Sequence, residues 1–280
     1  MAKAVPVRVR PWVPPSKKAL CLSAFFYAKF LAGITRVDEF QQLREQRMRE
    51  STREFRARGK SVVRCEKCQL ADFACICTWI HSQASAADFV VLMHRKEVFK
   101  PTNTGRFLAQ LFPDNCRVFA WDRTQPDPQL LELLADPRRE CLLVYPCEQP
   151  ERQTSVHPTN EKRLTFILLD GTWKQSGRMF HLSEWLKTIK AVALPERRRR
   201  GYTVRQSHQE NYLSTLEAAG VCLQLTGDER AGNYCLDFFD LFNQHYLATR
   251  GCYPPVPGEL HAKLSGQLLN ATSGAGATSD

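Results

Sequence analysis

The chain has 280 residues, 43% of them hydrophobic and 24% charged, which is typical of a globular protein with one large or two small domains. Its 39 basic and 29 acidic residues give a net charge of +10, which favours a polyanionic partner, nucleic acid before membrane. Eleven cysteines favour a reducing compartment, with thiols free or bound to metal, over a secreted disulfide scaffold. We therefore expect a cytoplasmic protein that does not act at a membrane.

Two segments precede the first motif. Residues 1–38 are a basic extension, with seven Lys or Arg and no acidic residue before Asp38, and we expect it to be disordered or dispensable. Its apolar run Ala19–Ile34 is interrupted by Lys29 and is short for a membrane span. Residues 39–60 are rich in Arg, Glu and Gln and predict an exposed charged helix, which either forms a solvated face or touches RNA.

Four cysteines fall within thirteen residues of the segment 61–80: Cys65, Cys68, Cys75 and Cys77. Four thiolates this close match the ligand number of a tetrahedral structural zinc site, and a knuckle of this size would draw much of its folding energy from the metal. Buried free cysteines and a redox pair are the alternatives. The C-x-C half is less usual for zinc than a second C-x-x-C.

From residue 81 to 255 short apolar runs alternate with helical patterns, which predicts a mostly parallel sheet with helices on both faces. The expected strands are Phe89–Met93, Arg117–Trp121, Cys141–Tyr145, Thr165–Leu169 and Ala191–Leu194. The expected helices are Thr104–Phe112, Gln129–Ala135, one from Lys174, one opened by the capping box Ser214-x-x-Glu217, and Glu229–Arg250 with Gly251 at its end. Residues 256–280 read as a flexible tail.

The stretch from Thr165 to Trp173 is the centre of this pattern. Its buried strand runs directly into Asp170, Gly171, Thr172 and Trp173. Open α/β sheets bind their ligands at the carboxyl ends of central strands, so these side chains are candidates for a site. The alternative is a plain junction in which Asp170 caps the following helix.

Other junctions also carry polar residues. In the segment Lys100–Arg106, Asn103 or Thr104 would cap a helix whose free amides could hold an anion. His94 follows the first strand and is more simply explained as a structural histidine. The run Arg197–Arg200 is either a solvated loop or a phosphate contact.

Taken together, these motifs resemble the DTW-domain family of tRNA-uridine aminocarboxypropyltransferases. The matching pieces, in order, are the four cysteines, Lys100-Pro-x-Asn103-Thr104-Gly105-Arg106, Tyr145-Pro146, Asp170-Gly171-Thr172-Trp173, Tyr202-x-x-Arg205, and Leu213-Ser214-Thr215-x-Glu217-Ala218. They cover roughly Phe40 to Arg250. A proline that is usual inside the family's cysteine cluster is absent here, where the chain reads Leu70-Ala71-Asp72.

The resemblance implies a SPOUT-like, knotted α/β domain that binds S-adenosylmethionine, preceded by a zinc knuckle. It implies transfer of the 3-amino-3-carboxypropyl group to N3 of a uridine in the tRNA variable loop (position 47), with release of 5′-methylthioadenosine.

The resemblance also assigns roles to residues. Asp170 would be the general base, assisted by Thr172 and Trp173. Cofactor contacts would come from Tyr145, Pro146, Leu169, Gly171, Tyr202, Arg205, Ser214, Thr215 and Glu217. Contacts with tRNA would come from Lys100, Asn103, Thr104, Gly105, Arg106, Arg197, Arg198, Arg199 and Arg200. Two rival functions are a SPOUT-type RNA methyltransferase that uses the same cofactor and a non-enzymatic zinc RNA-binding module.

Overall fold

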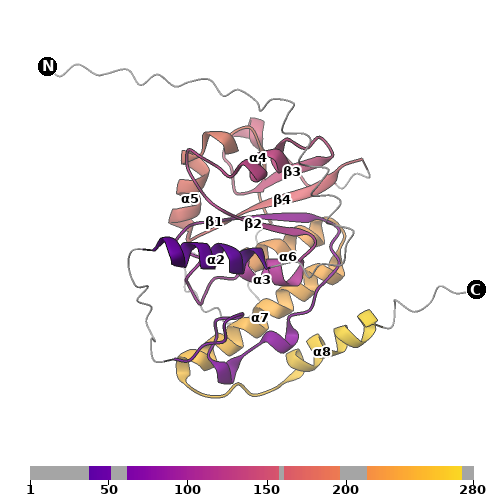
Figure 1. Cartoon of the computed structure of the whole chain (residues 1–280). Coiled ribbons are helices and arrows are strands. Elements are labelled where there is room, and N and C mark those ends of the chain that lie inside the picture. The colour runs from indigo at the N-terminus through magenta and orange to yellow at the C-terminus, as the bar shows by residue number, and fades with distance from the viewer. Residues whose placement is uncertain (1–37, 52–61, 158–160, 196–212, 273–280) are drawn as a thin grey trace, which may run out of the picture. The chain divides into compact units, whose positions relative to one another are not determined.

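The computed structural model describes residues 38–51, 62–157, 161–195 and 213–272 (Figure 1). Their centre is a five-stranded sheet of order β2-β1-β4-β3-β5, in which every neighbouring pair is parallel. The strands are β1 (Asp88–Met93), β2 (Cys116–Ala120), β3 (Arg139–Val144), β4 (Arg163–Asp170) and β5 (Lys190–Val192). The predicted parallel α/β architecture is confirmed, and the strand ends differ from the prediction by one or two residues.

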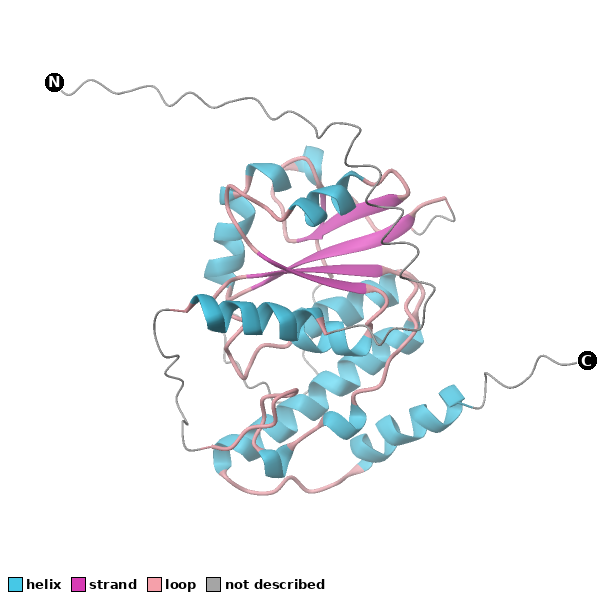
Figure 2. Ribbon diagram, in the orientation of Figure 1, coloured by secondary structure: helices cyan, strands magenta, loops and turns pink. Residues whose placement is uncertain are grey.

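Helices cover both faces of the sheet (Figure 2). They are α2 (Glu39–Glu50), α3 (Gly105–Leu111), α4 (Pro128–Ala135), α5 (Trp173–Leu182), α6 (Thr215–Leu225), α7 (Glu229–Gly251) and α8 (Glu259–Thr272). Side chains alternate along each strand, so Val91 and Phe166 face a core shared with α2, α3, α6 and α7, whereas Val90 and Ile167 face α4 and α5. Both faces are apolar, as in other buried parallel sheets.

The order of the strands places a crevice between β1 and β4. The connection from β1 through α3 leads to β2 on one side, and the connection from β4 through α5 leads to β5 on the other. Because crossovers between parallel strands are right-handed, two that run in opposite directions put their helices on opposite faces. The carboxyl ends of β1 and β4 are therefore the topological switch point, where such sheets bind ligands.

Several helix ends follow from local chemistry. The Asp38 carboxylate accepts the amide hydrogens of Phe40 and Gln41 and begins α2, which ends at Glu50, well before residue 60; residues 52–61 lie outside the described part. At the end of α7, Cys252 rather than Gly251 adopts the left-handed conformation, with φ of 55°. The sequence prediction placed Gly251 at that turn because glycine is the residue most often found there.

The C-terminal region differs from the flexible tail expected over 256–280. Helix α8 forms there, and its His261 and Leu264 side chains are buried against the rest of the domain (Figure 1, yellow). The path of the chain through 196–212, between β5 and α6, lies outside the described residues, so the knot stays a prediction. No helix among the described residues combines the length and the apolar character that a membrane crossing requires.

Candidate functional site

Asp170, the last residue of β4, joins three elements at the switch point. Its side chain is 4% exposed, its Oδ2 accepts a hydrogen bond from the Asn103 amide, and its Oδ1 accepts one of 2.6 Å from the Thr215 hydroxyl. Its carbonyl oxygen accepts the backbone N–H of His94 at 2.9 Å. One carboxylate thus holds the loop before α3 and the first turn of α6 against the sheet edge.

Gly105 is required by the same contact. A Cβ atom at this position would lie 2.8 Å from Asp170 Oδ2 and 2.9 Å from its Cγ. Such distances are too short for any real Cβ, so a side chain at residue 105 would push α3 away from the carboxylate. The glycine in the matched motif therefore has a packing reason.

The rest of the Lys100–Arg106 loop is largely buried. Asn103 is 1% exposed and Arg106 is 0% exposed, and the Asn103 carbonyl side-chain oxygen accepts the Arg106 N–H at 3.0 Å, which caps α3 as predicted. Lys100 pairs with the buried Glu97. The structure thus places Asn103, Thr104, Gly105 and Arg106 behind Asp170, where they shape the site, and their contact with tRNA stays a prediction.

Thr172, rather than Asp170, caps the helix that follows β4. Its hydroxyl accepts the Gln175 N–H at 3.4 Å, and the Gln175 side chain accepts the Thr172 N–H at 2.7 Å, which is a reciprocal capping box. The sequence alternative of an Asp170 cap is wrong, because β4 extends as far as Asp170 and the helix begins only at Trp173. Gly171 fits here because a Cβ would lie 2.9 Å from the Gln175 Cβ.

Aromatic side chains form a shelf beside this turn. The Tyr145 ring stacks on Phe180 at 4.2 Å between centroids and lies 6.4 Å from the Trp173 ring. Trp173 is 37% exposed, so its indole can meet a ligand. Tyr145, Pro146, Leu169 and Gly171 are therefore gathered with Trp173 where β3 and β4 end, as the resemblance implied.

His94 lies on the same edge, although the sequence analysis set it aside. Its ring stacks on Trp121 at 5.9 Å, its Nδ1 accepts the Lys96 N–H at 3.3 Å, and its backbone is bonded to Asp170. Burial lowers the pKa of the imidazole, which favours the neutral form. Its place directly after β1 at the switch point was the available signal.

The predicted capping box at the start of α6 is confirmed. Ser214 Oγ accepts the Glu217 N–H at 3.2 Å, and Glu217 accepts the Ser214 N–H at 2.8 Å. This box sets the first turn of α6, from which Thr215 reaches Asp170. Tyr202, Arg205 and the run Arg197–Arg200 lie outside the described residues.

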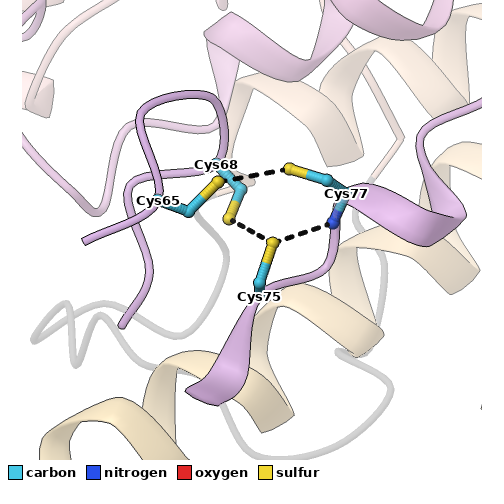
Figure 3. A group of neighbouring side chains, drawn as sticks. All are labelled: Cys65, Cys68, Cys75 and Cys77. Atoms are coloured by element: carbon cyan, nitrogen blue, oxygen red, sulfur yellow. Dashed lines mark hydrogen bonds between the residues drawn. The ribbon is translucent and has the colours of Figure 1, made fainter. Parts of the chain in front are cut away.

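The four predicted cysteines converge on one point (Figure 3). Their sulfur atoms all lie within 4.8 Å of one another, with Cys65 to Cys77 at 3.5 Å and Cys68 to Cys75 at 3.8 Å. A tetrahedral zinc ion with Zn–S bonds of about 2.3 Å sets its sulfurs about 3.8 Å apart, so the cluster fits such an ion. The group can hold a metal ion without rearranging its backbone.

Hydrogen bonding within the cluster divides the protons unequally. The Cys77 side chain and nearby backbone amides lower the pKa of Cys68 to about 5, while the same hydrogen bond raises the pKa of Cys77. Gln69, with φ of 63°, makes the turn between the first two cysteines in the absence of the usual proline. The hairpin is anchored to α7, because the Ala71 N–H donates to Thr249 Oγ1.

Together, a parallel α/β sheet, a polar site at its switch point and a four-cysteine centre define the class of protein. The DTW domain model matches residues 62–247, and the chain belongs to the DTW domain family.

Curated relatives are tRNA-uridine aminocarboxypropyltransferase 2 of Macaca fascicularis, 27% identical over 58% of this chain and 55% of that protein, and its namesake of Drosophila melanogaster, 29% identical over 57% of this chain and 65% of that protein. The mouse protein of the same name is 27% identical over 172 residues. The matched part thus spans a little over half to about two thirds of these relatives. No solved structure was found to match this chain.

Proposed function

We propose that this protein transfers the 3-amino-3-carboxypropyl group of S-adenosylmethionine to N3 of a uridine in the tRNA variable loop and releases 5′-methylthioadenosine. One observation carries the proposal: the matched segments around Asn103, Asp170 and Thr215 meet on a single carboxylate at the switch point. The names of the relatives add the reaction, and the net charge of +10 suits an RNA substrate.

We propose that the cofactor binds along the shelf at the ends of β3 and β4. The exposed face of Trp173 offers a surface for a base or for the positive sulfonium, and the stacked Tyr145 keeps that side of the crevice apolar. S-adenosylmethionine supplies the carbon that is attacked and its own leaving group. The protein then has to align this carbon with the uracil N3, and alignment alone can remove a large part of a barrier.

The proton on N3 must leave before or during attack, and Asp170 is our candidate acceptor. It is the carboxylate of the central motif, but both of its oxygens also hold neighbouring elements in place. Accepting a proton would require one of these two hydrogen bonds to weaken. His94, neutral and half-buried on the same edge, is the second candidate.

We propose that the ion in the four-cysteine centre is Zn²⁺ and that it is structural. Four cysteine sulfurs are the donor set of closed zinc sites, which leave no position for a substrate. The hairpin contains few apolar residues of its own, so the metal would contribute to its folding.

The test is product analysis with the purified protein, S-adenosylmethionine and unmodified tRNA. We expect 5′-methylthioadenosine and a tRNA nucleoside that is heavier by the aminocarboxypropyl group, both read by mass spectrometry. Formation of S-adenosylhomocysteine and a methylated base would instead identify a methyltransferase. Binding of tRNA without any heat of S-adenosylmethionine binding would identify a non-enzymatic RNA-binding module.

A further inference from the structure

Arg106 is a buried cation without a direct ionic partner among the described residues. Its side chain is 0% exposed and lies over the Phe40 and Phe107 rings, at 6.0 and 5.3 Å from their centroids. Its Nε and Nη2 donate to the carbonyl oxygens of Lys100, Pro101 and Asn103, while its Nη1 has no hydrogen-bond partner. Burying a charge in this way is costly unless nearby negative charge compensates it.

The compensating charge comes from two directions. Burial lowers the pKa of Arg106 to about 9, and the negative charges that oppose this shift are the Cys68 thiolate first and the Asp170 carboxylate second. Arg106 and Cys68 share one buried core, so little water separates them. The guanidinium therefore lies in the field of both the cysteine centre and the switch-point carboxylate.

The contacts of Arg106 fix the loop that holds Asp170. Its guanidinium binds three carbonyl oxygens of the segment 100–103, and its backbone N–H binds the Asn103 side-chain oxygen at 3.0 Å. This last bond orients the Asn103 side chain so that its amide donates to Asp170. Displacement of Arg106 would therefore disturb the carboxylate.

We propose that Arg106 is a positioning residue that couples the metal centre to the switch-point site. Four thiolates around a divalent cation carry a net charge of about −2. This charge stabilises the buried guanidinium, and the guanidinium in turn holds the Asn103–Asp170 hydrogen bond. Loss of the metal lets the thiols take up protons, removes this charge and loosens the loop. The part of the inference that concerns cofactor binding rests on the function proposed above.

The first experiment measures zinc alone, in the full-length zinc-loaded protein, as the rate of release to a colorimetric chelator. Arg106→Met removes the charge and keeps an apolar stem, whereas Arg106→Lys keeps the charge and loses the fork of hydrogen bonds. Residues around a metal site commonly change affinity about 10–100-fold, so we expect roughly tenfold faster release from Arg106→Met. Arg106→Lys should release zinc at nearly the wild-type rate. Equal rates in all three proteins would overturn the proposal.

The second experiment measures S-adenosylmethionine affinity by calorimetry before and after zinc removal, with folding checked by circular dichroism. We expect metal removal to weaken binding about tenfold in the wild type and to have little further effect in Arg106→Lys, whose loop is already released. The matched control is Arg44→Gln, because Arg44 lies near Arg106 but bonds to Gln69, at 3.2 Å, rather than to the loop. It should keep the wild-type dependence on metal.

The outcomes separate the two proposals. If the zinc-loaded wild type shows no affinity for S-adenosylmethionine, the proposed function fails, and the zinc-release arm still decides the role of the Arg106 charge. If the wild type binds the cofactor equally well with and without zinc, the coupling is refuted. If Arg106→Met does not fold, the comparison rests on Arg106→Lys, in which wild-type cofactor affinity would also refute it.

Discussion

At the sheet edge, Asp170 receives hydrogen bonds from side chains of two other segments, whereas the four sulfur atoms of the cysteine centre have chiefly one another as polar neighbours. The first region is therefore organised by the protein itself: its donors are paired and its carboxylate is fixed. The second gathers four groups that compete for protons, and it becomes fully satisfied when a cation replaces those protons. Structural order can thus come from the chain or from a bound ion, and this molecule uses both.

Removing a metal ligand should give the largest effect on this contrast. Cys68 is fully buried, and Cys68→Ser replaces a thiolate by a poor zinc ligand, so we expect metal affinity to fall on the order of 100-fold or more, together with thermal stability. Elemental analysis and thermal unfolding would measure both. Cys252→Ser, at an exposed cysteine outside the centre, is the control and should change neither. A zinc-free wild-type protein of unchanged stability would contradict the expectation.

At the sheet edge, Asp170→Asn tests the proton-acceptor role. The amide keeps the shape and can still accept from Asn103, so binding of cofactor and tRNA should persist while turnover falls about 10²–10⁴-fold. Steady-state kinetics and calorimetry would measure the two. Near-normal turnover would show that Asp170 serves only to hold the site and would move the acceptor role to His94.

Asp170→Ala is the companion variant, because it leaves the Asn103 amide and the Thr215 hydroxyl without their acceptor. Each buried group that loses its partner costs about 1–3 kcal/mol, so the variant should be measurably less stable than Asp170→Asn. Equal stability of the two variants in urea unfolding would argue against the network described for this edge.

The sequence predicted the framework because local patterns determine it. Strands such as β4 are continuous buried apolar runs, and the Ser214–Glu217 capping box is complete within four residues, so both were found. The hydrogen bond from Asn103 to Asp170 joins residues 67 apart in the chain, and no local pattern reports such a pair. The capping role of Thr172 depended on β4 reaching Asp170, which only the sheet register fixes.

Helix α8 illustrates the same limit in another region. Its segment looked like a tail because its neighbours are small and polar, yet contacts with distant residues fix its first turns. His261 meets His245 of α7, and Ser265 accepts a hydrogen bond of 3.2 Å from the Trp79 indole. Packing between elements, rather than local propensity, forms this helix.

A smaller effect is expected from Gly105→Ala, which tests how tightly the sheet edge is packed. The added methyl group would lie 2.8 Å from Asp170 Oδ2, and overpacking of this kind typically costs about 1–3 kcal/mol. Gly266→Ala in α8 is the control, because a Cβ there meets nothing within 4 Å and alanine favours a helix. Chemical unfolding of both variants would measure the difference, and an equally stable Gly105→Ala would show that α3 can shift freely.

The smallest effect concerns two histidines that fasten α8 beside the cysteine hairpin. The Gly258 N–H donates to His261 Nδ1 at 3.0 Å, so the proton of His261 is on Nε2 and points to His245 Nε2, 2.9 Å away. His245 must then carry its proton on Nδ1, from which it donates to the Ala74 carbonyl at 3.0 Å. Both rings are therefore neutral, and protonation of either one breaks a bond in this chain.

Burial lowers the pKa of both imidazoles below their unfolded value of 6.5. The unfolded chain therefore binds more protons than the folded one as the pH falls, and the stabilisation is complete above pH 6.5 and is lost as the pH drops through the folded values. The slope is at most about 1.4 kcal/mol per pH unit for each proton, so we expect a loss of about 1 kcal/mol between pH 7.5 and 5.5. Urea unfolding of the zinc-loaded protein, with its zinc content checked at each pH, would measure it. His261→Gln should reduce the slope, whereas replacement of the exposed His157 by Gln should not. An unchanged slope in His261→Gln would assign the acid sensitivity to other groups and leave α8 held by its apolar contacts and the Trp79–Ser265 hydrogen bond.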